Sequence, residues 1–306
     1  MELDPIVTLP PDLEFGAMQT AAAPWHFPED VWKPIWDQLD VSRIAVAVLD
    51  TGYTKHRLGP EPVASKSFIR GESVEDRVSG HGTHCIGTVL GKDGMGAAPG
   101  AQLMVGKVLS NRGSGSSSGI AAGIRWAVDQ GAHIISMSLG GGSSYGPTNE
   151  AIDYAFSKGC WVNAAAGNSG FRGANTIGWP AKYSGCLCCG AYQRNGSIAN
   201  FSSGGREIDW ACPGQDIISF ATDGRSLRSM SGTSMATPYG SGVLAIVYDH
   251  MLRTGQSVYT AADDLREWFK LNMKDAGAPG FDYRFGMGIP VIDEITEALL
   301  GDNLWT

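Results

Sequence analysis

Three short segments of the chain carry the residue types that nucleophilic catalysis requires. Asp50 follows a continuous apolar run, His81 lies among glycines, and Ser234 lies in the segment Ser231–Pro238. A serine hydroxyl is a weak nucleophile at neutral pH, so it needs a base within hydrogen-bond reach, and that base needs an acceptor that fixes its tautomer. Each segment alone has an ordinary explanation, as a turn aspartate, a loop histidine or an N-cap serine. Together they predict an Asp-His-Ser catalytic site.

The order of these residues and the motifs around them argue against two other kinds of catalytic site. Hydrolases with a Gly-x-Ser-x-Gly elbow run Ser-Asp-His, whereas this chain runs Asp-His-Ser and has Gly-Thr-Ser-Met-Ala around its serine. His81 and His84 are three residues apart, on one face of a helix, so a metal pair is an alternative. The His-Glu-x-x-His pattern with its glutamate base is absent. The sequence therefore assigns no metal ligand.

Alternating apolar runs and helical segments predict the scaffold that positions these residues. The expected strands are Ile44–Leu49, Gln102–Leu109, His133–Ser138, Cys160–Ala165 and Cys186–Ala191, and the expected helices are Ser118–Gln130, Thr148–Lys158, Thr237–Leu252 and Thr260–Leu271. This alternation predicts an α/β fold with a three-layer, doubly wound, mostly parallel sheet and helices on both faces. Such sheets bind ligands beyond the carboxyl ends of their strands. Asp50, Ser138 and Asn168 all fall at or just after expected strand ends.

Capping residues mark the expected beginnings of these helices. Thr148 is a plausible N-cap, Pro238 suits the first turn of a buried helix, and Thr260 and Asp263 lie near capping-box spacing. His81 and His84 open a further helix. Ser234 would then lie at the positive end of a helix dipole, which favours negative charge that develops nearby.

The first 40 residues differ from the rest of the chain. They contain six prolines and three tryptophans, Trp25, Trp32 and Trp36, without a clear period. We expect residues 1–40 to be an N-terminal arm that lies on the main domain, and residues 41–306 to be a single catalytic domain.

The composition of the chain argues against two classes of partner, nucleic acids and membranes. Glycine accounts for 42 of 306 residues and the net charge is −8. An acidic chain lacks the basic face that nucleic-acid binding requires, and no apolar run reaches the ~18 residues of a membrane helix. The acidic, proline-rich start lacks the pattern of a signal peptide, so we expect a cytoplasmic protein, or a secreted one if Met1 is an engineered start. The oligomeric state stays open.

Six cysteines allow three interpretations. They are Cys85, Cys160, Cys186, Cys188, Cys189 and Cys212. A chain of this length does not need disulfide staples, and Cys-x-Cys-Cys lacks the paired spacing of zinc sites. Free, buried thiols are therefore favoured over one disulfide or a metal cluster.

Five segments, in order, resemble the subtilisin-like serine proteases (subtilases). They are AVAVLDTG, GHGTHCIGTV, ISMSLGG, AAAGNSG and MSGTSMATP. The resemblance implies the subtilisin-like fold and a serine endopeptidase that forms an acyl-enzyme. It implies that Asp50 orients the imidazole, that His81 is the general base and acid, and that Ser234 is the nucleophile. Asn168 matches the asparagine of the oxyanion hole, and His84 is expected to be structural.

The same resemblance implies a substrate groove for protein or peptide chains. One edge matches Ser138, Leu139 and Gly140, and the opposite edge matches Gly113, Ser114 and Gly115. Small residues there let a peptide add as a β-strand. Gly178 falls where the family places the base of the primary pocket, so we expect a preference for large apolar or aromatic residues just before the cut. Ordinary loop glycines remain the alternative for each glycine.

The chain differs from secreted family members at two places, which affect the binding of ions and the reactivity of a thiol. The stretch Leu90–Gly96 is short and has one acid, Asp93, so it is not expected to hold their tight calcium ion, which takes six to eight oxygen ligands. No cofactor is expected to be required, while a weak calcium or sodium site stays open. Cys85 is similar to the cysteine of the proteinase-K-like and thiol-dependent branches, so mercurials are expected to inhibit.

The arm is more similar to intracellular subtilisins, whose N-terminal extension lies across the cleft and is clipped on activation. The segment Val7–Pro11 could lie there, because prolines fix an extended chain and resist cleavage. The motif of the intracellular arm is absent. Two other functions stay open: a selective maturation protease for one partner, and a catalytically silent subtilase-fold binding module.

Overall fold

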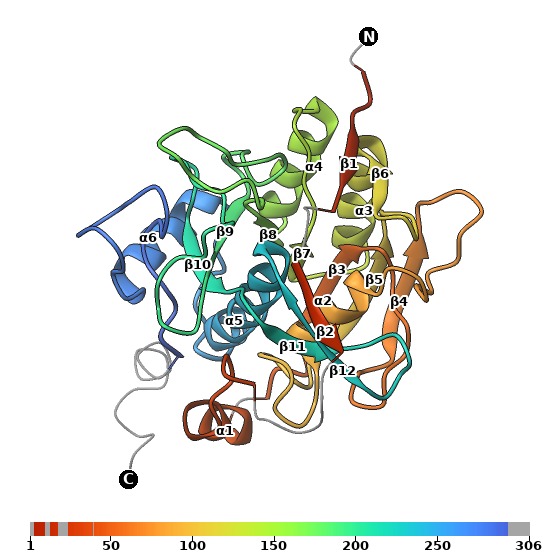
Figure 1. Cartoon of the computed structure of the whole chain (residues 1–306), viewed down its shortest axis with the longest axis horizontal. Coiled ribbons are helices and arrows are strands. Elements are labelled where there is room, and N and C mark those ends of the chain that lie inside the picture. Colours follow the sequence, from red (N-terminus) through yellow and green to blue (C-terminus); the bar gives the residue numbers. More distant parts are fainter. Residues whose placement is uncertain (1–2, 10–12, 18–23, 39, 293–306) are drawn as a thin grey trace.

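A seven-stranded parallel sheet forms the centre of the molecule. The computed structural model describes residues 3–9, 13–17, 24–38 and 40–292. The strand order is β10-β9-β8-β7-β3-β5-β4, and every neighbouring pair is parallel (Figure 1). The strands are β3 (Ala45–Asp50), β4 (Pro62–Ser67), β5 (Gln102–Lys107), β7 (Ile134–Met137), β8 (Trp161–Ala165), β9 (Leu187–Tyr192) and β10 (Trp210–Pro213).

Helices cover both faces of this sheet. On one face lie α2 (His81–Leu90) and α5 (Thr233–Arg253), and on the other lie α3 (Ser117–Asp129) and α4 (Gly146–Ser157). A further helix, α6 (Ala262–Asn272), is tied to the sheet by Arg266, whose Nε lies 2.6 Å from Asp209 Oδ1. The expected three-layer α/β fold is confirmed.

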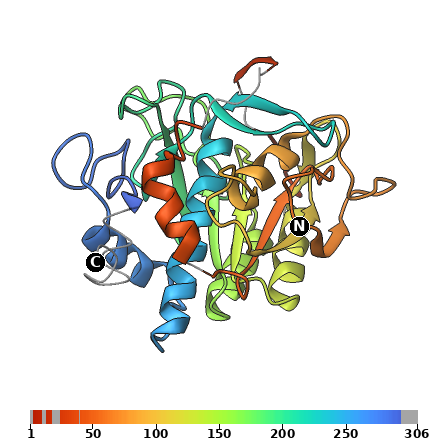
Figure 2. The ribbon, with the colours of Figure 1, turned by 90° about the horizontal axis from the view of Figure 1, so that it is seen from below.

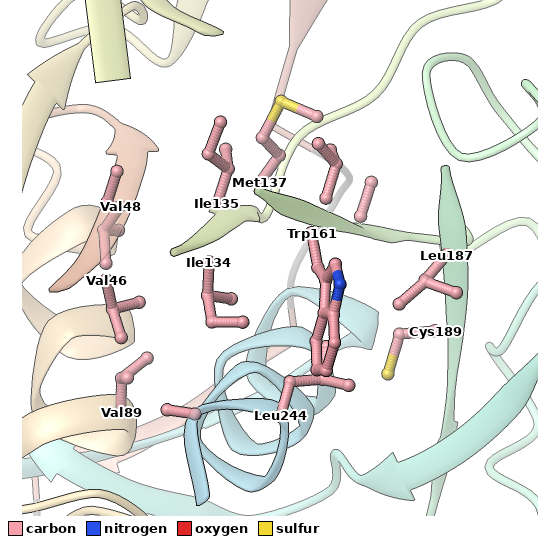
Figure 3. Packing of buried hydrophobic residues seen from close by; sticks show 14 of the residues in the cluster. Val46, Val48, Val89, Ile134, Ile135, Met137, Trp161, Leu187, Cys189 and Leu244 are labelled. Atoms are coloured by element: carbon pink, nitrogen blue, oxygen red, sulfur yellow. The ribbon is translucent and has the colours of Figure 1, made fainter. Parts of the chain in front are cut away.

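Burial on both faces explains the continuous apolar runs of the central strands. All residues of β3, β7 and β8 are buried. Successive side chains of a strand point to opposite faces. Figure 3 shows this on β7, where Ile134 points toward Leu244 of α5, while Ile135 and Met137 point the other way. A parallel sheet with helices on both sides therefore requires apolar residues at every position.

Two smaller sheets include the N-terminal arm. β1 (Ile6–Thr8) pairs antiparallel with β6 (Ser114–Ser116). β2 (Leu13–Ala17) pairs antiparallel with β12 (Leu227–Ser231), which also pairs with β11 (Ile217–Phe220). In Figure 1 the two red strands of the arm lie against β6 and β12.

Aromatic contacts fasten the rest of the arm to the domain. Phe27 stacks on Tyr239 of α5 at 5.3 Å between ring centroids, and Trp32 meets Tyr239 edge-on at 5.6 Å. Trp25 Nε1 donates to the carbonyl oxygen of Gln215 at 3.1 Å. Trp32 lies on α1 (Glu29–Gln38), a helix that the sequence analysis did not predict and that runs alongside α5 in Figure 2. These contacts are with residues distant in sequence. Within α1, however, apolar residues recur at helical spacing, with Trp32 and Ile35 buried, so the expectation that the first 40 residues lack a clear period is wrong for this helix.

Two helices begin earlier than expected. α4 begins at Gly146 with Tyr145 as its N-cap, so the prediction of Thr148 as N-cap is wrong. The Thr148 hydroxyl instead donates to the carbonyl oxygen of Ser117 at 3.1 Å. α5 begins at Thr233 rather than Thr237, which places Pro238 inside the helix instead of in its first turn.

Three further details differ from the predictions. α6 has Ala261 as its N-cap and no side-chain cap bond, so the expected capping box is absent, and Asp263 pairs with Arg266 instead. The strands β4 and β6 were not predicted. Their sequences, PVASKS and SGS, are short and polar and do not alternate between apolar and polar residues. Their pairing with β5 and β1 therefore depends on the folded structure rather than on a local pattern.

All six cysteines are free and buried, as the favoured interpretation expected. Burial raises the pKa of Cys160, Cys186 and Cys188, so these thiols stay protonated. No helix in the described part of the chain is long and apolar enough to cross a membrane.

Candidate active site

Asp50 lies at the carboxyl end of β3 and is almost fully buried. Its Oδ1 accepts hydrogen bonds from the backbone N–H of Thr51 at 2.7 Å and from Nδ1 of His81 at 2.8 Å. Two donors therefore converge on one carboxylate oxygen. The structure thus brings together Asp50 and His81, which are 31 residues apart in the sequence.

His81 is the first residue of α2, and glycines allow its helix to begin beside the end of β3. Gly80 takes a left-handed conformation with φ +67°, which glycine adopts without strain. A Cβ atom on Gly82 would overlap the carbonyl oxygen of Gly52. With Nδ1–H donating to Asp50, the imidazole presents Nε2 as its basic nitrogen.

Ser234 is the second residue of α5, and its backbone is held by two side chains. Pro238 has no N–H, so it cannot make the usual helical bond to the carbonyl oxygen of Ser234. That oxygen instead accepts from Ser138 Oγ at 2.8 Å and from Cys85 Sγ at 3.5 Å. Cys85 Sγ also lies 3.8 Å from Nδ1 of His81, so one thiol contacts both the histidine and the backbone of the serine.

Asn168 follows the end of β8 and is fastened to the start of α5. Its Oδ1 accepts from the backbone N–H and from the hydroxyl of Thr233, both at 2.9 Å. The Thr233 hydroxyl in turn accepts from the backbone N–H of Gly167 at 3.1 Å. Because Thr233 uses the amide oxygen, the NH₂ group of Asn168 is the part of the side chain suited to stabilise an oxyanion.

The two expected groove edges both bond to one segment of the arm. The backbone of Thr8 exchanges two hydrogen bonds with Gly140, at 3.1 and 3.0 Å, and the N–H of Leu9 donates to the carbonyl oxygen of Gly113 at 2.9 Å. Ser114 and Gly115 face Thr8 and Val7 across the β1–β6 pair. Both edges therefore accept an extended chain as an added strand. Leu139, between Ser138 and Gly140, is fully buried.

Gly178 lies between the segments that follow β7 and β8. Its N–H donates to the carbonyl oxygen of Ala166 at 3.0 Å, and a Cβ atom at this position would lie 3.3 Å from the carbonyl oxygen of Gly141. A side chain at position 178 would therefore crowd the space beside the groove edge that contains Gly140.

The second histidine of the glycine-rich segment has a different environment. His84 is fully buried, and its Nε2 lies 3.0 Å from the carbonyl oxygen of Ile217 and 3.3 Å from that of Arg228. Burial, with the positive charge of Arg228, holds the pKa of His84 well below its ordinary value. His84 is thus a neutral donor that ties α2 to the β11–β12 hairpin.

One group of three possible metal ligands occurs in the described part of the chain, and it overlaps the site itself. Oxygen, nitrogen and sulfur atoms of Asp50, His81 and Cys85 lie within 4.8 Å of one another. The Asp50–His81 hydrogen bond already uses two of these groups.

Sequence reasoning missed two residues that surround the Asp50–His81 pair. The Thr51 hydroxyl accepts from the backbone N–H of Gly82 at 3.0 Å and donates to the carboxylate of Asp76. Thr51 could have been noticed because it follows Asp50. Asp76 belongs to no motif, and its role depends on folding of the loop before α2.

Comparisons with known proteins agree with this geometry. The family model described as "Subtilase family" matches residues 42–288. Subtilisin DY of Bacillus licheniformis is 40% identical over 211 residues, which are 67% of this chain and 77% of that protein. Subtilisin Savinase of Lederbergia lenta is 40% identical over 67% of this chain and 76% of its own length. M-protease of Shouchella clausii is 38% identical over 81% of this chain and 65% of its own length.

Proposed function

Because this chain belongs to the subtilase family of serine proteases, we propose that it cleaves peptide bonds through an acyl-enzyme formed on Ser234. The observation that carries this proposal is the 2.8 Å bond between Asp50 and Nδ1 of His81, together with the contacts of Cys85 to His81 and to the Ser234 backbone. These contacts orient the His81 imidazole and place Cys85 between that ring and the Ser234 backbone, which supports a base acting on a serine at a helix N-terminus.

The proposed reaction moves one proton at each step. Nε2 of His81 takes the proton of the Ser234 hydroxyl as Oγ attacks the carbonyl carbon of the peptide bond. Asp50 stabilises the imidazolium that forms and keeps its own charge. His81 then gives the proton to the leaving amine, which leaves an ester on Ser234. Water, activated by the same imidazole, hydrolyses the ester. This chemistry requires no cofactor.

Two donors are proposed to stabilise the oxyanion of the tetrahedral intermediate. The NH₂ group of Asn168 is one, and its bonds to Thr233 keep it beside α5. The backbone N–H of Ser234 is the other, and it lies in the first turn of α5, where N–H groups have no helical partner. The positive end of the helix dipole adds to their effect.

We propose that substrates bind as an extended strand between Gly113–Gly115 and Ser138–Gly140. The backbone bonds of Thr8 and Leu9 to Gly140 and Gly113 support this, because main-chain pairing of this kind does not depend on side chains. The absence of a side chain at Gly178 supports a roomy, uncharged pocket for a large apolar or aromatic residue just before the cut.

We propose that the arm itself binds in this groove before any substrate does, and that it is therefore an inhibitory segment. Its strand β1 bonds to both groove edges, and Ser234 and His81 are buried in this state. Two prolines, Pro10 and Pro11, follow Leu9 in the sequence, and a bond between prolines is a poor site for cleavage. Mass spectrometry of fully active enzyme tests this: the arm is expected to be cut, and an intact Met1–Thr20 segment would contradict the proposal.

A fluorophosphonate probe tests the catalytic proposal directly. The activated full chain is expected to be labelled at Ser234, and Ser234→Ala is expected to abolish both labelling and peptide cleavage. A folded protein that is not labelled would instead be a silent binding module. Profiling with a peptide library then tests the pocket, since preference for charged residues before the cut would contradict the role given to Gly178.

A further inference from the structure

The Asp76 carboxylate is completely buried in the loop that leads into α2. Its Oδ1 accepts from the backbone N–H groups of Val78 at 3.0 Å and Ser79 at 2.9 Å. Its Oδ2 accepts from the N–H of Gly80 at 2.9 Å and from the Thr51 hydroxyl. A buried carboxylate is tolerated only when its charge is satisfied, and here four donors do so. No cationic side chain of the described residues pairs with it.

Thr51 connects this carboxylate to both members of the Asp50–His81 pair. Its hydroxyl donates to Asp76 and accepts from the N–H of Gly82, the residue after His81. Its backbone N–H donates to the same Asp50 oxygen that bonds Nδ1 of His81. A closed ring results. It consists of the Asp50–Thr51 and His81–Gly82 peptide bonds and the two hydrogen bonds Thr51–Gly82 and His81–Asp50, and it fixes the end of β3 relative to the start of α2.

The start of α2 depends on this ring because its N-cap residue makes no side-chain bond, and the nearby Ser79 hydroxyl accepts from the N–H of His81 only at a long 3.4 Å. Gly80, its N-cap residue, has no side chain, and the first N–H groups of a helix lack helical partners. Thr51 satisfies the N–H of Gly82 from a distant strand. The negative charge of Asp76 also lies at the positive end of the helix dipole.

Two cations face the same loop without bonding the Asp76 carboxylate. Nζ of Lys107, on β5, donates to the carbonyl oxygen of Thr51, and Nη2 of Arg228, on β12, donates to that of Ser79 at 3.1 Å. The nearby His84 stays neutral because burial lowers its pKa, and burial raises the pKa of the Cys85 thiol. Lys107 also pairs with Glu72 at 3.2 Å, whereas Asp50 and Asp76 are the two carboxylates that accept hydrogen bonds from Thr51.

We propose that Thr51 and Asp76 are positioning residues for catalysis, holding Asp50 and His81 in register and placing a second negative charge behind the pair. This inference rests on the proposed function of the same site. The hydroxyl of Thr51 transmits the constraint, and the charge of Asp76 orients that hydroxyl and favours the imidazolium formed during proton transfer.

Kinetics of three variants test the inference, with rates normalised to the Ser234 sites titrated by a fluorophosphonate. Thr51→Val keeps the shape but removes the hydroxyl, and it is expected to lower kcat roughly 10- to 100-fold with KM changed less than about threefold, as a small displacement of catalytic groups does. Thr51→Ser restores the hydroxyl and is expected to recover most of kcat. Asp76→Asn is expected to lower kcat and to move the acidic limb of the kcat profile to lower pH.

Asp249→Asn is the matched control, because Asp249 is equally buried but pairs with Arg43 and Arg253 at the far end of α5. It is expected to lower the melting temperature and leave kcat unchanged. Proton NMR of the Nδ1–H of His81 provides a readout without turnover, and its low-field resonance is expected to move upfield in Asp76→Asn. The inference is overturned if Thr51→Val keeps full kcat, if Thr51→Ser fails to recover it, or if Asp76→Asn changes only the melting temperature. A wild-type chain that the probe does not label refutes the proposed function instead, and the inference with it.

Discussion

Acid is expected to destabilise the protein through His26, a histidine that anchors the arm. His26 is 2% exposed, and neither ring nitrogen makes a hydrogen bond within the described residues. Its neighbours are the rings of Trp25 and Phe27, with centroids at 5.9 and 4.6 Å. Burial without a partner penalises the charged form and lowers the pKa of His26 from 6.5 to about 3.

The size and sign of the effect follow from this shift in pKa. Above pH 6.5 the imidazole is neutral in both the folded and the unfolded chain, so it does not affect stability. Between pH 6.5 and about 3 only the unfolded chain takes up the proton, so the free energy of unfolding falls by about 1.4 kcal/mol per pH unit. The total loss approaches about 5 kcal/mol, of which about 2.5 kcal/mol falls between pH 7 and pH 4.5.

Urea unfolding of the full chain at pH 7, 5.5 and 4.5 measures this loss. The Ser234→Ala background prevents self-digestion, and His26→Leu serves as the comparison because leucine fills a similar apolar space without a titratable group. The buried His84 and the half-buried His133 also have lowered pKa values, so the relevant quantity is the difference between the two proteins. His26→Leu is expected to lose about 2.5 kcal/mol less than its parent from pH 7 to pH 4.5. If both proteins lose stability in parallel, the argument from a buried neutral imidazole is wrong.

Three further predictions follow from the site and its supports. Asn168→Ala should lower kcat by roughly 10²–10³ with KM nearly unchanged, a magnitude taken from the oxyanion-hole asparagine of a subtilisin. Steady-state kinetics measures both constants, and an equal rise in KM would contradict the role proposed for Asn168. Gly178→Val should lower kcat/KM at least about tenfold for peptides with phenylalanine before the cut and less for alanine, because the added side chain enters the pocket; an equal loss for both peptides would place Gly178 outside it. Arg266→Ala should destabilise the fold by about 3–5 kcal/mol in urea, because it leaves the Asp209 charge buried without its partner; a loss below about 1 kcal/mol would show that the pair is not structural.

The sequence was most informative where one local pattern decides the structure. The apolar runs of β3, β7 and β8 reflect burial on both faces, so their positions could be predicted within a few residues. Because a parallel sheet brings the carboxyl ends of its strands to one edge, Asp50, Ser138 and Asn168 could be expected to meet there.

Features that depend on distant partners could not be predicted in this way. Thr148 has the composition of an N-cap, but its hydroxyl bonds to Ser117 on a neighbouring helix, and α4 begins earlier. α1, by contrast, does have an apolar period: Val31, Trp32, Ile35 and Trp36 recur at helical spacing and pack on the core, so this helix could have been predicted and was missed. The buried carboxylate of Asp76 acquires its partners only when the loop before α2 folds.

The beginnings of α2 and α5 show why the site needs such distant partners. Both helices have glycine at the N-cap, Gly80 and Gly232, and neither has a local side-chain cap. Their first N–H groups are therefore open to residues from strand ends: Thr51, after β3, accepts from Gly82, and Asn168, after β8, accepts from Thr233. Each remote cap aligns a helix with the strand end that holds its proposed chemical partner, Asp50 for the first helix and the amide of Asn168 for the second. A side-chain cap at either N-cap residue would compete for these N–H groups. At Gly80 the left-handed backbone and the adjacent Thr222 side chain also leave no room for one. The two helices thus lack the stability of a local cap. Hydrogen bonds from distant residues instead fix the register between strand and helix on which the proposed proton transfer depends.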